Sequence, residues 1–217
     1  MTKRKKHFYN ITNTSDLLIT PGDDFAIGHK WKRKETFGYN KVVLELACGK
    51  GEYTVWLAQH FPDTLFIGVD IKWDRFSRGI QKAQEQWLTN IRFIRGIIQH
   101  LERWFGEHEI DEIWIVHPDP RPRGSDEWRR LTSPRFLKMY EVMLVPGAKV
   151  RLKTDDQPLF SYSLESFEWE WRNCLAETTD LHSSPLLEDH YEIMTDYEKM
   201  ALDKGKTICY GVRKKTQ

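Results

Sequence analysis

The sequence predicts an α/β fold in which a doubly wound, mostly parallel sheet carries helices on both faces. The first observation behind this prediction is the regular alternation of apolar runs and helical patterns from residue 41 onwards. The second is the stretch VVLELACGKGEYT at 42–54, where an apolar run passes through the turn Gly49-Lys50-Gly51 into a helical pattern. The third is Asp70, which ends the next apolar run nineteen positions after Gly51. Strand, glycine turn, helix, strand and acid is a layout by which α/β proteins hold a nucleoside.

Seven short apolar runs predict the strands of this sheet. They are KVVLEL at 41–46, TLFIGVD at 64–70, IRFIRG at 91–96, EIWIVH at 112–117, KVRLKTD at 149–155, CLAETTD at 174–180 and TICYGVRK at 207–214. The segment before them, residues 1–40, is polar, basic and weakly periodic. We expect it to form a mobile N-terminal arm, with a short helix near its end, in front of one domain over 41–217.

Six segments predict helices, and three of them show an apolar face at helical spacing. The helices are expected over 51–61, 74–88, 98–105, 133–144, 158–170 and 195–203. The apolar faces comprise Tyr53, Trp56, Leu57 and Phe61, then Phe76, Ile80, Ala83 and Trp87, and then Phe136, Leu137, Tyr140 and Leu144. Asp74 is the expected N-cap of the second helix, whereas Pro146-Gly147 and Gly205 are expected to end the fourth and the sixth.

Length and composition are those of an ordinary globular protein. A chain of 217 residues, 30% charged and 40% hydrophobic, suits one domain with a full core. No apolar run approaches the ~20 residues that span a bilayer, and the basic start lacks the apolar stretch of a secretory signal. Cys48, Cys174 and Cys209 show no CxxC spacing, and the eight histidines show no ligand spacing. We therefore expect a cytoplasmic protein with reduced thiols, no membrane segment and no metal.

Positive charge is clustered although the formal net charge is only +1. The clusters are TKRKK at 2–6, HKWKRK at 29–34, RPR and WRR within 121–130, and VRKK at 212–215. Any one of them is readily explained as solvated surface. Several together on a nearly neutral chain favour a local anion-binding face, for which nucleic acid is the leading candidate.

Polar residues gather where the predicted strands end. They are Glu45, the turn at 48–51, Asp70, Gly96-Ile97, the HPDP run at 117–120, and Lys153-Thr154-Asp155. A single acid in a surface loop is usually only solvated. Because ligands of open α/β sheets bind at the carboxyl ends of the strands, the whole set favours a binding site.

The glycine turn distinguishes between kinds of nucleoside. A dinucleotide-binding fold typically carries the motif GxGxxG. Here Gly49 and Gly51 are followed by Glu52, Tyr53 and Thr54, so the third glycine is missing. The acid before the glycines, Glu45, would repel a phosphate. It suits a cofactor with a positive centre and an amino acid end, which indicates S-adenosylmethionine.

At this point the sequence resembles a known family. The motifs LELACGKGEYT, FIGVD, HPDPRPR with a following RRL, LKTD and TDYEK, in this order and spacing, resemble the bacterial tRNA (guanine-N7)-methyltransferases over about residues 40–212. The resemblance implies a seven-stranded sheet of the class I methyltransferase (Rossmann-like) type. It further implies methyl transfer from S-adenosylmethionine to N7 of a guanine in the tRNA variable loop. Monomer and homodimer both remain open.

The resemblance also implies roles for individual residues. The cofactor residues would be Glu45, Gly49, Gly51, Asp70, Ile97 and Asp119, of which Asp119 matches the acid regarded as catalytic. The substrate residues would be Arg123, Asp155, Thr195, Asp196, Tyr197 and Glu198. The stretch 124–130 lies where the family contacts RNA, with Arg129 and Arg130 suited to phosphates.

The chemistry of such a reaction agrees with these roles. Guanine N7 already carries an in-plane lone pair, so no base is needed and catalysis should come mainly from positioning for in-line displacement. Methylation leaves a cationic purine, which nearby carboxylates would stabilise. A carboxylate such as Asp155 or Glu198 could accept hydrogen bonds from guanine N1–H and the exocyclic amine, which adenine cannot match.

Three departures from the family pattern keep alternatives open. Arg121 replaces the usual Trp, Ile97 stands where an acid is often found near the adenine, and Gly124-Ser125-Asp126 replaces a basic stretch. These changes concern cofactor affinity and tRNA contact more than the fold. The alternatives are a methyltransferase of the same fold with a different target, and a tRNA-binding protein with weakened catalysis.

Overall fold

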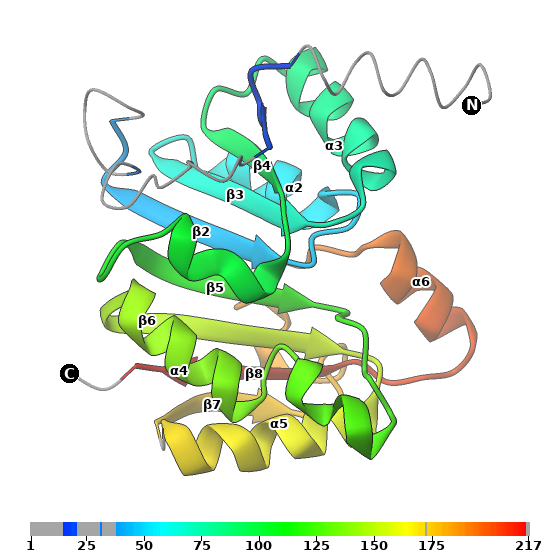
Figure 1. Ribbon diagram of the computed structural model, residues 1–217. Coiled ribbons are helices and arrows are strands. Elements are labelled where there is room, and N and C mark those ends of the chain that lie inside the picture. The colour runs from blue at the N-terminus through cyan, green and yellow to red at the C-terminus, as the bar shows by residue number, and fades with distance from the viewer. Residues whose placement is uncertain (1–14, 21–30, 32–37, 172, 216–217) are drawn as a thin grey trace. The chain divides into compact units, whose positions relative to one another are not determined.

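The computed structural model describes residues 15–20, 31, 38–171 and 173–215 (Figure 1). The chain forms two compact units, residues 1–110 and residues 111–217. Within the described residues there are eight strands, which are the seven predicted ones and one short addition. The predicted α/β class is confirmed.

The first unit contains four parallel strands. They are β1 (Leu18–Ile19), β2 (Lys41–Leu46), β3 (Thr64–Asp70) and β4 (Ile91–Arg95), in the order β1-β4-β3-β2. β2 and β3 are buried at almost every position, which explains their continuous apolar runs. Parallel pairing sets Glu45 of β2 beside Gly68 of β3. The ends of β2 and β3 therefore lie next to each other.

The first unit also contains three helical segments, which are α2 (Glu52–His60), α3 (Trp73–Glu85) and the 3-10 helix η1 (Ile98–Arg103). Ile80 and Ala83 are buried on α3 as predicted. Trp87 was placed wrongly on that face, because α3 ends at Glu85 and Trp87 adopts a left-handed φ of 56° with its side chain 89% exposed. The side chain of Phe76 lies outside the described ones.

The predicted N-cap of α3 is also wrong. The helix begins at Trp73 with Lys72 as its N-cap residue, so Asp74 lies inside the first turn. The short helix expected near the end of the arm falls outside the described residues. Of the arm, β1 pairs with β4, and Trp31 is buried with its indole N–H donating to the carbonyl of Trp104 at 2.8 Å.

The second unit contains four strands, among which β8 forms two antiparallel pairs. Its strands are β5 (Ile110–Val116), β6 (Leu144–Thr154), β7 (Cys174–Thr178) and β8 (Cys209–Lys214), in the order β5-β6-β8-β7. β8 runs antiparallel to both β6 and β7. The helix predicted over 133–144 ends at Met143, before Pro146-Gly147 as expected. The next strand begins earlier than the predicted 149, so that both residues lie within β6, with Gly147 at a φ of 79°.

Three α-helices and two 3-10 helices accompany these strands among the described residues. They are η2 (Gly124–Arg129), α4 (Pro134–Met143), α5 (Gln157–Glu170), η3 (Pro185–Leu187) and α6 (Asp196–Asp203). Asp156 caps α5 by accepting from the N–H of Leu159 at 2.8 Å, and Thr195 caps α6 by accepting from the N–H of Glu198 at 3.2 Å. None of the described helices is long and apolar enough to cross a bilayer.

Candidate active site

The glycine turn of the first unit is shaped by close packing around its backbone. Gly49 and Gly51 have φ values of 54° and 69°, in the left-handed region that favours glycine. A Cβ at Gly51 would lie 2.5 Å from Phe93 Cε1, whereas a Cβ at Gly49 would meet nothing within 4 Å. The turn is therefore packed against the core at Gly51 and open at Gly49.

Two glycines that sequence reasoning missed take the place of the absent third one. A Cβ at Gly79 of α3 would lie 2.7 Å from the carbonyl oxygen of Lys50, and one at Gly68 of β3 would lie 2.8 Å from Cys48 Sγ. Both glycines let neighbouring elements approach the turn closely. The signal was available, because a glycine inside a strand or helix pattern marks a close backbone approach.

Asp70 holds the turn from the end of β3. Its carboxylate accepts a hydrogen bond from the N–H of Gly49 at 3.0 Å and another from the N–H of Lys72 at 3.0 Å. The side chain is largely buried. Asp70, an expected cofactor residue, thus also fixes the glycine turn, and each of its carboxylate oxygens keeps a further lone pair.

Glu45 is bonded to the beginning of α2. Its Oε2 accepts from the backbone N–H of Thr54 at 2.8 Å and from the Thr54 hydroxyl. Gly51, the N-cap residue, has no side chain for this purpose, so Glu45 supplies the missing cap. Burial raises the pKa of Glu45 to about 8, although both hydrogen bonds from Thr54 oppose the rise.

Ile97 follows β4 and is 44% exposed. The preceding Gly96 packs on Trp104, since a Cβ at Gly96 would lie 2.0 Å from its ring. The structure therefore brings together Glu45, Gly49, Gly51 and Asp70, and places Ile97 after the neighbouring strand with an apolar surface open to solvent.

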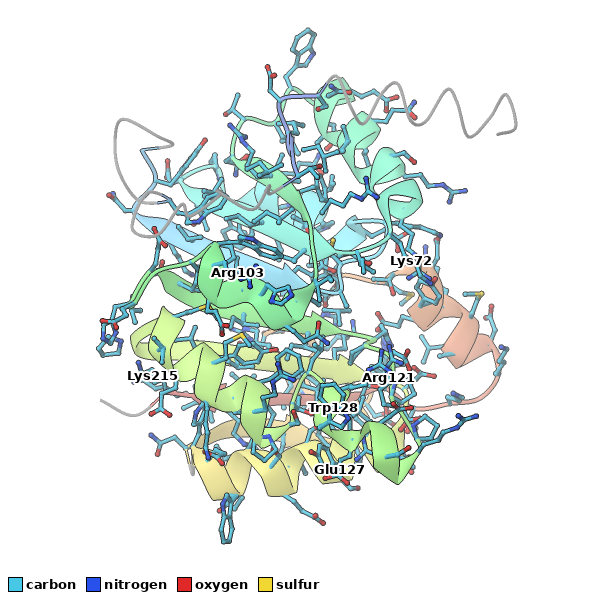
Figure 2. All side chains as sticks on the ribbon, viewed as in Figure 1. Lys72, Arg103, Arg121, Glu127, Trp128 and Lys215 are labelled. Atoms are coloured by element: carbon cyan, nitrogen blue, oxygen red, sulfur yellow. The ribbon has the colours of Figure 1, made fainter. Side chains whose placement is uncertain are left out.

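In the second unit, Asp119 is paired with the arginine that departs from the family pattern. The Arg121 guanidinium lies 3.0 Å from Asp119 Oδ2, and the side chain of Asp119 is 61% exposed. Arg121 has a φ of 48°, and its N–H donates to Asp119 Oδ1 at 3.3 Å. Figure 2 shows Arg121 in the segment after β5, together with Trp128 of η2. Arg123 is exposed nearby in the chain.

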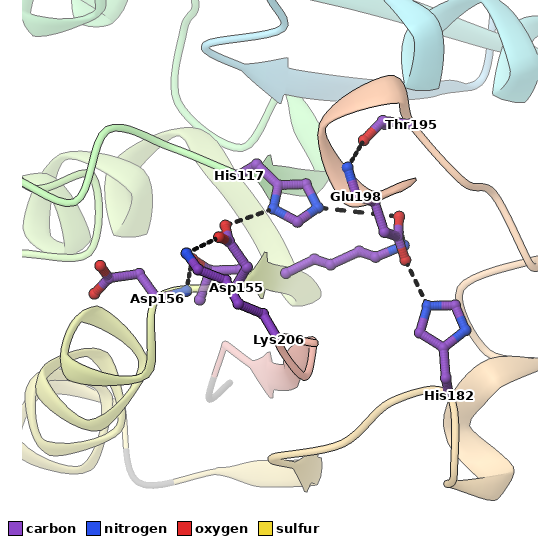
Figure 3. Close-up of polar contacts among 9 residues, drawn as sticks. His117, Asp155, Asp156, His182, Thr195, Glu198 and Lys206 are labelled. Carbon is purple, nitrogen blue, oxygen red and sulfur yellow. Dashed lines mark hydrogen bonds and ion pairs between the residues drawn. The ribbon is translucent and has the colours of Figure 1, made fainter. Parts of the chain in front are cut away.

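Asp155 and Glu198 lie in one polar cluster of the second unit (Figure 3). His117 Nδ1 is 3.3 Å from Asp155 Oδ1, and His117 Nε2 is 4.0 Å from Glu198 Oε2. Two lysines complete the cluster: Lys206 Nζ is 2.6 Å from Asp155 Oδ2, and Lys153 Nζ is 2.6 Å from Glu198 Oε2. The end of β6 and helix α6 are thus joined through opposite charges.

The two carboxylates of this cluster differ in their access to solvent. The side chain of Asp155 is 28% exposed, whereas Glu198 is fully buried, and its Oε1 lies 2.9 Å from His182 Nε2. Glu198 therefore contacts protein groups through both oxygens, so that a contact with guanine stays a prediction. Thr195 acts as the cap of α6, while Asp196 and Tyr197 are exposed on it.

The charges of the cluster support one another. Burial would raise the pKa of Glu198, but its interactions with His117, Lys153 and His182 lower it to about 2. Burial lowers the pKa of Lys153 to about 8, although Glu198 opposes the shift. Hydrogen bonds from His117 and Lys206 hold the pKa of Asp155 well below its ordinary value. Both carboxylates are ionised at neutral pH.

The two arginines expected to contact RNA have different surroundings. Arg130 donates to the carbonyl oxygen of Arg121 at 3.1 Å, and its guanidinium lies 4.2 Å from the centre of the Tyr162 ring. These contacts hold the backbone of the segment that carries Asp119. Arg129 is exposed and pairs with Asp126 at 3.3 Å. Beside it, Trp128 is 51% exposed.

Sequence reasoning missed His117, Lys153, Lys206 and His182 as partners of the site carboxylates. His117 and Lys153 stand in strand-end runs that had been singled out, so their positions were a usable signal. Lys206 and His182 are distant in the chain from Asp155 and Glu198, and no local pattern marks them. Among the described residues, no group of three His, Cys, Asp or Glu side chains could hold a metal ion.

Comparison with known proteins assigns the chain to a family. A family model described as a putative methyltransferase matches residues 39–210. The tRNA (guanine-N(7)-)-methyltransferase of Cytophaga hutchinsonii is 41% identical over 213 residues, which are 97% of this chain and 96% of that one. The chain belongs to the tRNA (guanine-N7)-methyltransferase family. Another family member, from Brevibacillus brevis, is 34% identical over 186 residues, which are 85% of this chain and 86% of that one.

Solved structures confirm the class I methyltransferase fold of this family member. The 16S rRNA methyltransferase KamB matches with a TM-score of 0.60 at 14% identity, covering 82% of this chain and 89% of that one. A structure described as an antibiotic related methyltransferase also gives 0.60, at 17% identity over 83% of this chain and 92% of the other. At such identities the likeness concerns the fold.

Proposed function

We propose that the protein transfers a methyl group from S-adenosylmethionine to N7 of a guanine in the variable loop of tRNA. The observation that carries this proposal is the 41% identity to the Cytophaga hutchinsonii tRNA (guanine-N(7)-)-methyltransferase across 97% of the chain. Likeness over this length includes both the glycine turn of the first unit and the carboxylate cluster of the second. The basic N-terminal arm, residues 1–40, would precede a methyltransferase domain over 41–217.

The residues of the first unit fit S-adenosylmethionine. The open position at Gly49 allows a ligand to approach the backbone of the turn. Asp70 retains lone pairs for ribose hydroxyls, and exposed Ile97 offers an apolar surface for an adenine. Glu45 precedes the turn and could pair with the cationic end of the ligand. A positive charge near Glu45 would favour the ionised form of its carboxyl group. The cofactor supplies an electrophilic methyl group on a sulfonium.

The second unit would bind and orient the base. N7 of guanine needs no deprotonation, so the task of the protein is to hold the base in line and to tolerate the positive charge that develops on it. Asp155 is the more accessible carboxylate and is ionised at neutral pH, so it can accept from N1–H and the exocyclic amine. Asp119, exposed and acidic, is the proposed catalytic residue, and Arg123 would contact the substrate.

The surface from η2 to α4 would contact the RNA. Arg129 and Trp128 are exposed there, and the guanidinium carbon of Arg135 lies 5.4 Å from the Trp128 ring. Cations suit phosphates, and an exposed indole offers a face on which a base can stack. Arg130 would act indirectly, by holding the backbone at 120–121.

Product analysis tests this proposal directly. The protein is incubated with methyl-labelled S-adenosylmethionine and unmodified bulk tRNA, and the RNA is digested to nucleosides. Label in 7-methylguanosine supports the proposal, and label in any other nucleoside contradicts it. Mapping of the modified position by fragmentation then tests the variable loop. Absence of both transfer and cofactor binding in a calorimetric titration would instead favour a tRNA-binding protein with weakened catalysis.

A further inference from the structure

His117 lies between two carboxylates that come from different elements of the second unit (Figure 3). It follows β5, and its side chain is only 7% exposed. Asp155 follows β6, with Oδ1 at 3.3 Å from His117 Nδ1, and Glu198 lies on α6, with Oε2 at 4.0 Å from His117 Nε2. The imidazole thus faces one acid with each of its nitrogens.

The backbone of His117 is held for this orientation. Its φ of 45° lies in the left-handed region that residues other than glycine adopt rarely. Its N–H donates to the carbonyl oxygen of Lys153 at 2.8 Å, which attaches the turn to the end of β6. An unfavourable conformation held in place by the surrounding structure indicates that the position of this side chain matters.

The geometry also selects the protonation state of the imidazole. An ionised carboxylate only accepts hydrogen bonds, so the nitrogen facing Asp155 must carry a proton. An unprotonated Nε2 would direct its lone pair towards the carboxylate of Glu198. Burial lowers the pKa of His117 and the charge of Lys153 does the same, but Asp155 and Glu198 outweigh both and raise it. Among the described residues, the charged or titratable groups around the cluster include Asp155, Glu198, Lys153, His182, His190 and Lys206.

We propose that His117 is a positioning residue, which as an imidazolium ties the end of β6 to helix α6 and thereby presents Asp155 to the guanine. The inference rests on the proposed function for the identity of the base. Asp155 has one oxygen oriented by His117 and the other paired with exposed Lys206. Helix α6 carries exposed Asp196 and Tyr197 on the turn that begins with Thr195. His117 therefore contacts both segments that we propose to bind the substrate, and it adds to the direct pair that Lys153 forms with Glu198.

The bridge that protonated His117 forms between Asp155 and Glu198 should depend on pH. Because the pKa of His117 is raised above its ordinary value, the bridge is complete below that value and is lost as the pH rises through the raised pKa. A neutral imidazole leaves one nitrogen without a proton, so it cannot serve both acids. The KM for tRNA should consequently rise on the alkaline side, while kcat changes less.

The test compares His117→Gln with His60→Gln, which replaces an exposed histidine of α2. Glutamine keeps a donor towards Asp155 but carries no charge. At neutral pH, His117→Gln should raise the KM for tRNA ~10-fold, the effect of losing about one charge-assisted interaction, with kcat within about twofold. The alkaline rise of KM should be present in wild type and in His60→Gln and absent in His117→Gln. A variant that keeps both the wild-type KM and its pH dependence would overturn the proposal.

A second measurement needs neither tRNA nor a folded variant. In the wild-type protein labelled with ¹⁵N-histidine, NMR should show that the pKa of His117 lies above the ordinary value for histidine, with both ring nitrogens protonated below that pKa. A pKa below the ordinary value would refute the bridge, whatever the enzyme produces. If His117 is an imidazolium but the protein forms no 7-methylguanosine, the proposed function is refuted. Guanine is then also refuted as the base that Asp155 binds.

Discussion

Arg121 neutralises Asp119, with its guanidinium 3.0 Å from the Asp119 carboxylate. This pair joins the acid proposed as catalytic to the residue that departs from the family pattern. An acid that must stabilise positive charge on a substrate is weakened by a fixed cation beside it. The pair therefore either opens when substrate binds or sets the rate of the enzyme.

Removing the acid should abolish most methyl transfer without unfolding the protein. We expect Asp119→Asn to lower kcat ~10²–10³-fold, the usual effect of removing one preorganised electrostatic contact, while thermal unfolding stays unchanged because the side chain is exposed. Initial rates of label transfer measure the effect. Asp63→Asn, at an exposed loop acid of the first unit, is the control and should keep wild-type rates. Equal rates in both variants would mean that Asp119 has no catalytic role.

Removing the cation should have the opposite effect. Arg121→Gln frees the Asp119 carboxylate and also leaves the carbonyl of residue 121 bonded to Arg130. We expect kcat to rise about 2–5-fold, as expected for the loss of an exposed ion pair worth less than 1 kcal/mol. Single-turnover rates at saturating tRNA give the answer. A fall in the rate would show instead that Arg121 itself assists the substrate.

Gly49 and Gly51 form a matched pair for the glycine turn. Both have positive φ, so alanine costs ~1–2 kcal/mol at either position. At Gly51 the added Cβ also meets Phe93, which adds ~1–3 kcal/mol for overpacking. Urea unfolding should therefore rank Gly51→Ala as the less stable variant. Calorimetry should show that Gly49→Ala, although it is the milder change for the fold, weakens S-adenosylmethionine binding by narrowing the open side of the turn.

Glu45 should make the stability of the protein depend on pH. The folded protein retains a proton on Glu45 up to about pH 8, whereas the unfolded chain releases it near the ordinary value of 4.5. The unfolded state thus binds fewer protons between these values, and the free energy of unfolding should fall as the pH rises through this range. Glu45→Gln stays neutral and should flatten that fall, by roughly 1–3 kcal/mol between its ends. Exposed Glu102→Gln should leave the wild-type curve unaltered.

Arg129 and Arg130 should separate in their response to salt. We expect Arg129→Ala to reduce the salt slope of tRNA binding by about one unit, because one phosphate contact is lost. Arg130→Ala should leave the slope unchanged and lower kcat instead, since its guanidinium is bonded to the backbone at 120–121. Binding titrations over a range of salt concentrations distinguish the two. Identical slopes in both variants would contradict this division of roles.

Much of the architecture followed from pattern alone. Strands β2 and β3 were predictable because parallel strands buried on both faces are continuous apolar runs, and the glycine turn because its backbone requires positive φ. Where a prediction was wrong, the local sequence pattern disagreed with the path that the folded chain takes. Trp87 continues the helical period of α3, yet the chain turns after Glu85. Pro146-Gly147 does follow the end of a helix, but the strand predicted from 149 already begins at Leu144 and includes both residues.

The sequence by itself determined the fold class, the cofactor turn and the acids at the strand ends, because these depend on periodicity and on the conformational demands of single residues. Only the tertiary structure decided what those acids touch. Glu45 caps α2, Arg121 pairs with Asp119, and His117 lies between Asp155 and Glu198. These contacts join residues that are distant in the chain or that no periodic pattern relates. Their charges and pKa values arise from burial and from neighbours brought together by folding, which no local pattern of residues records.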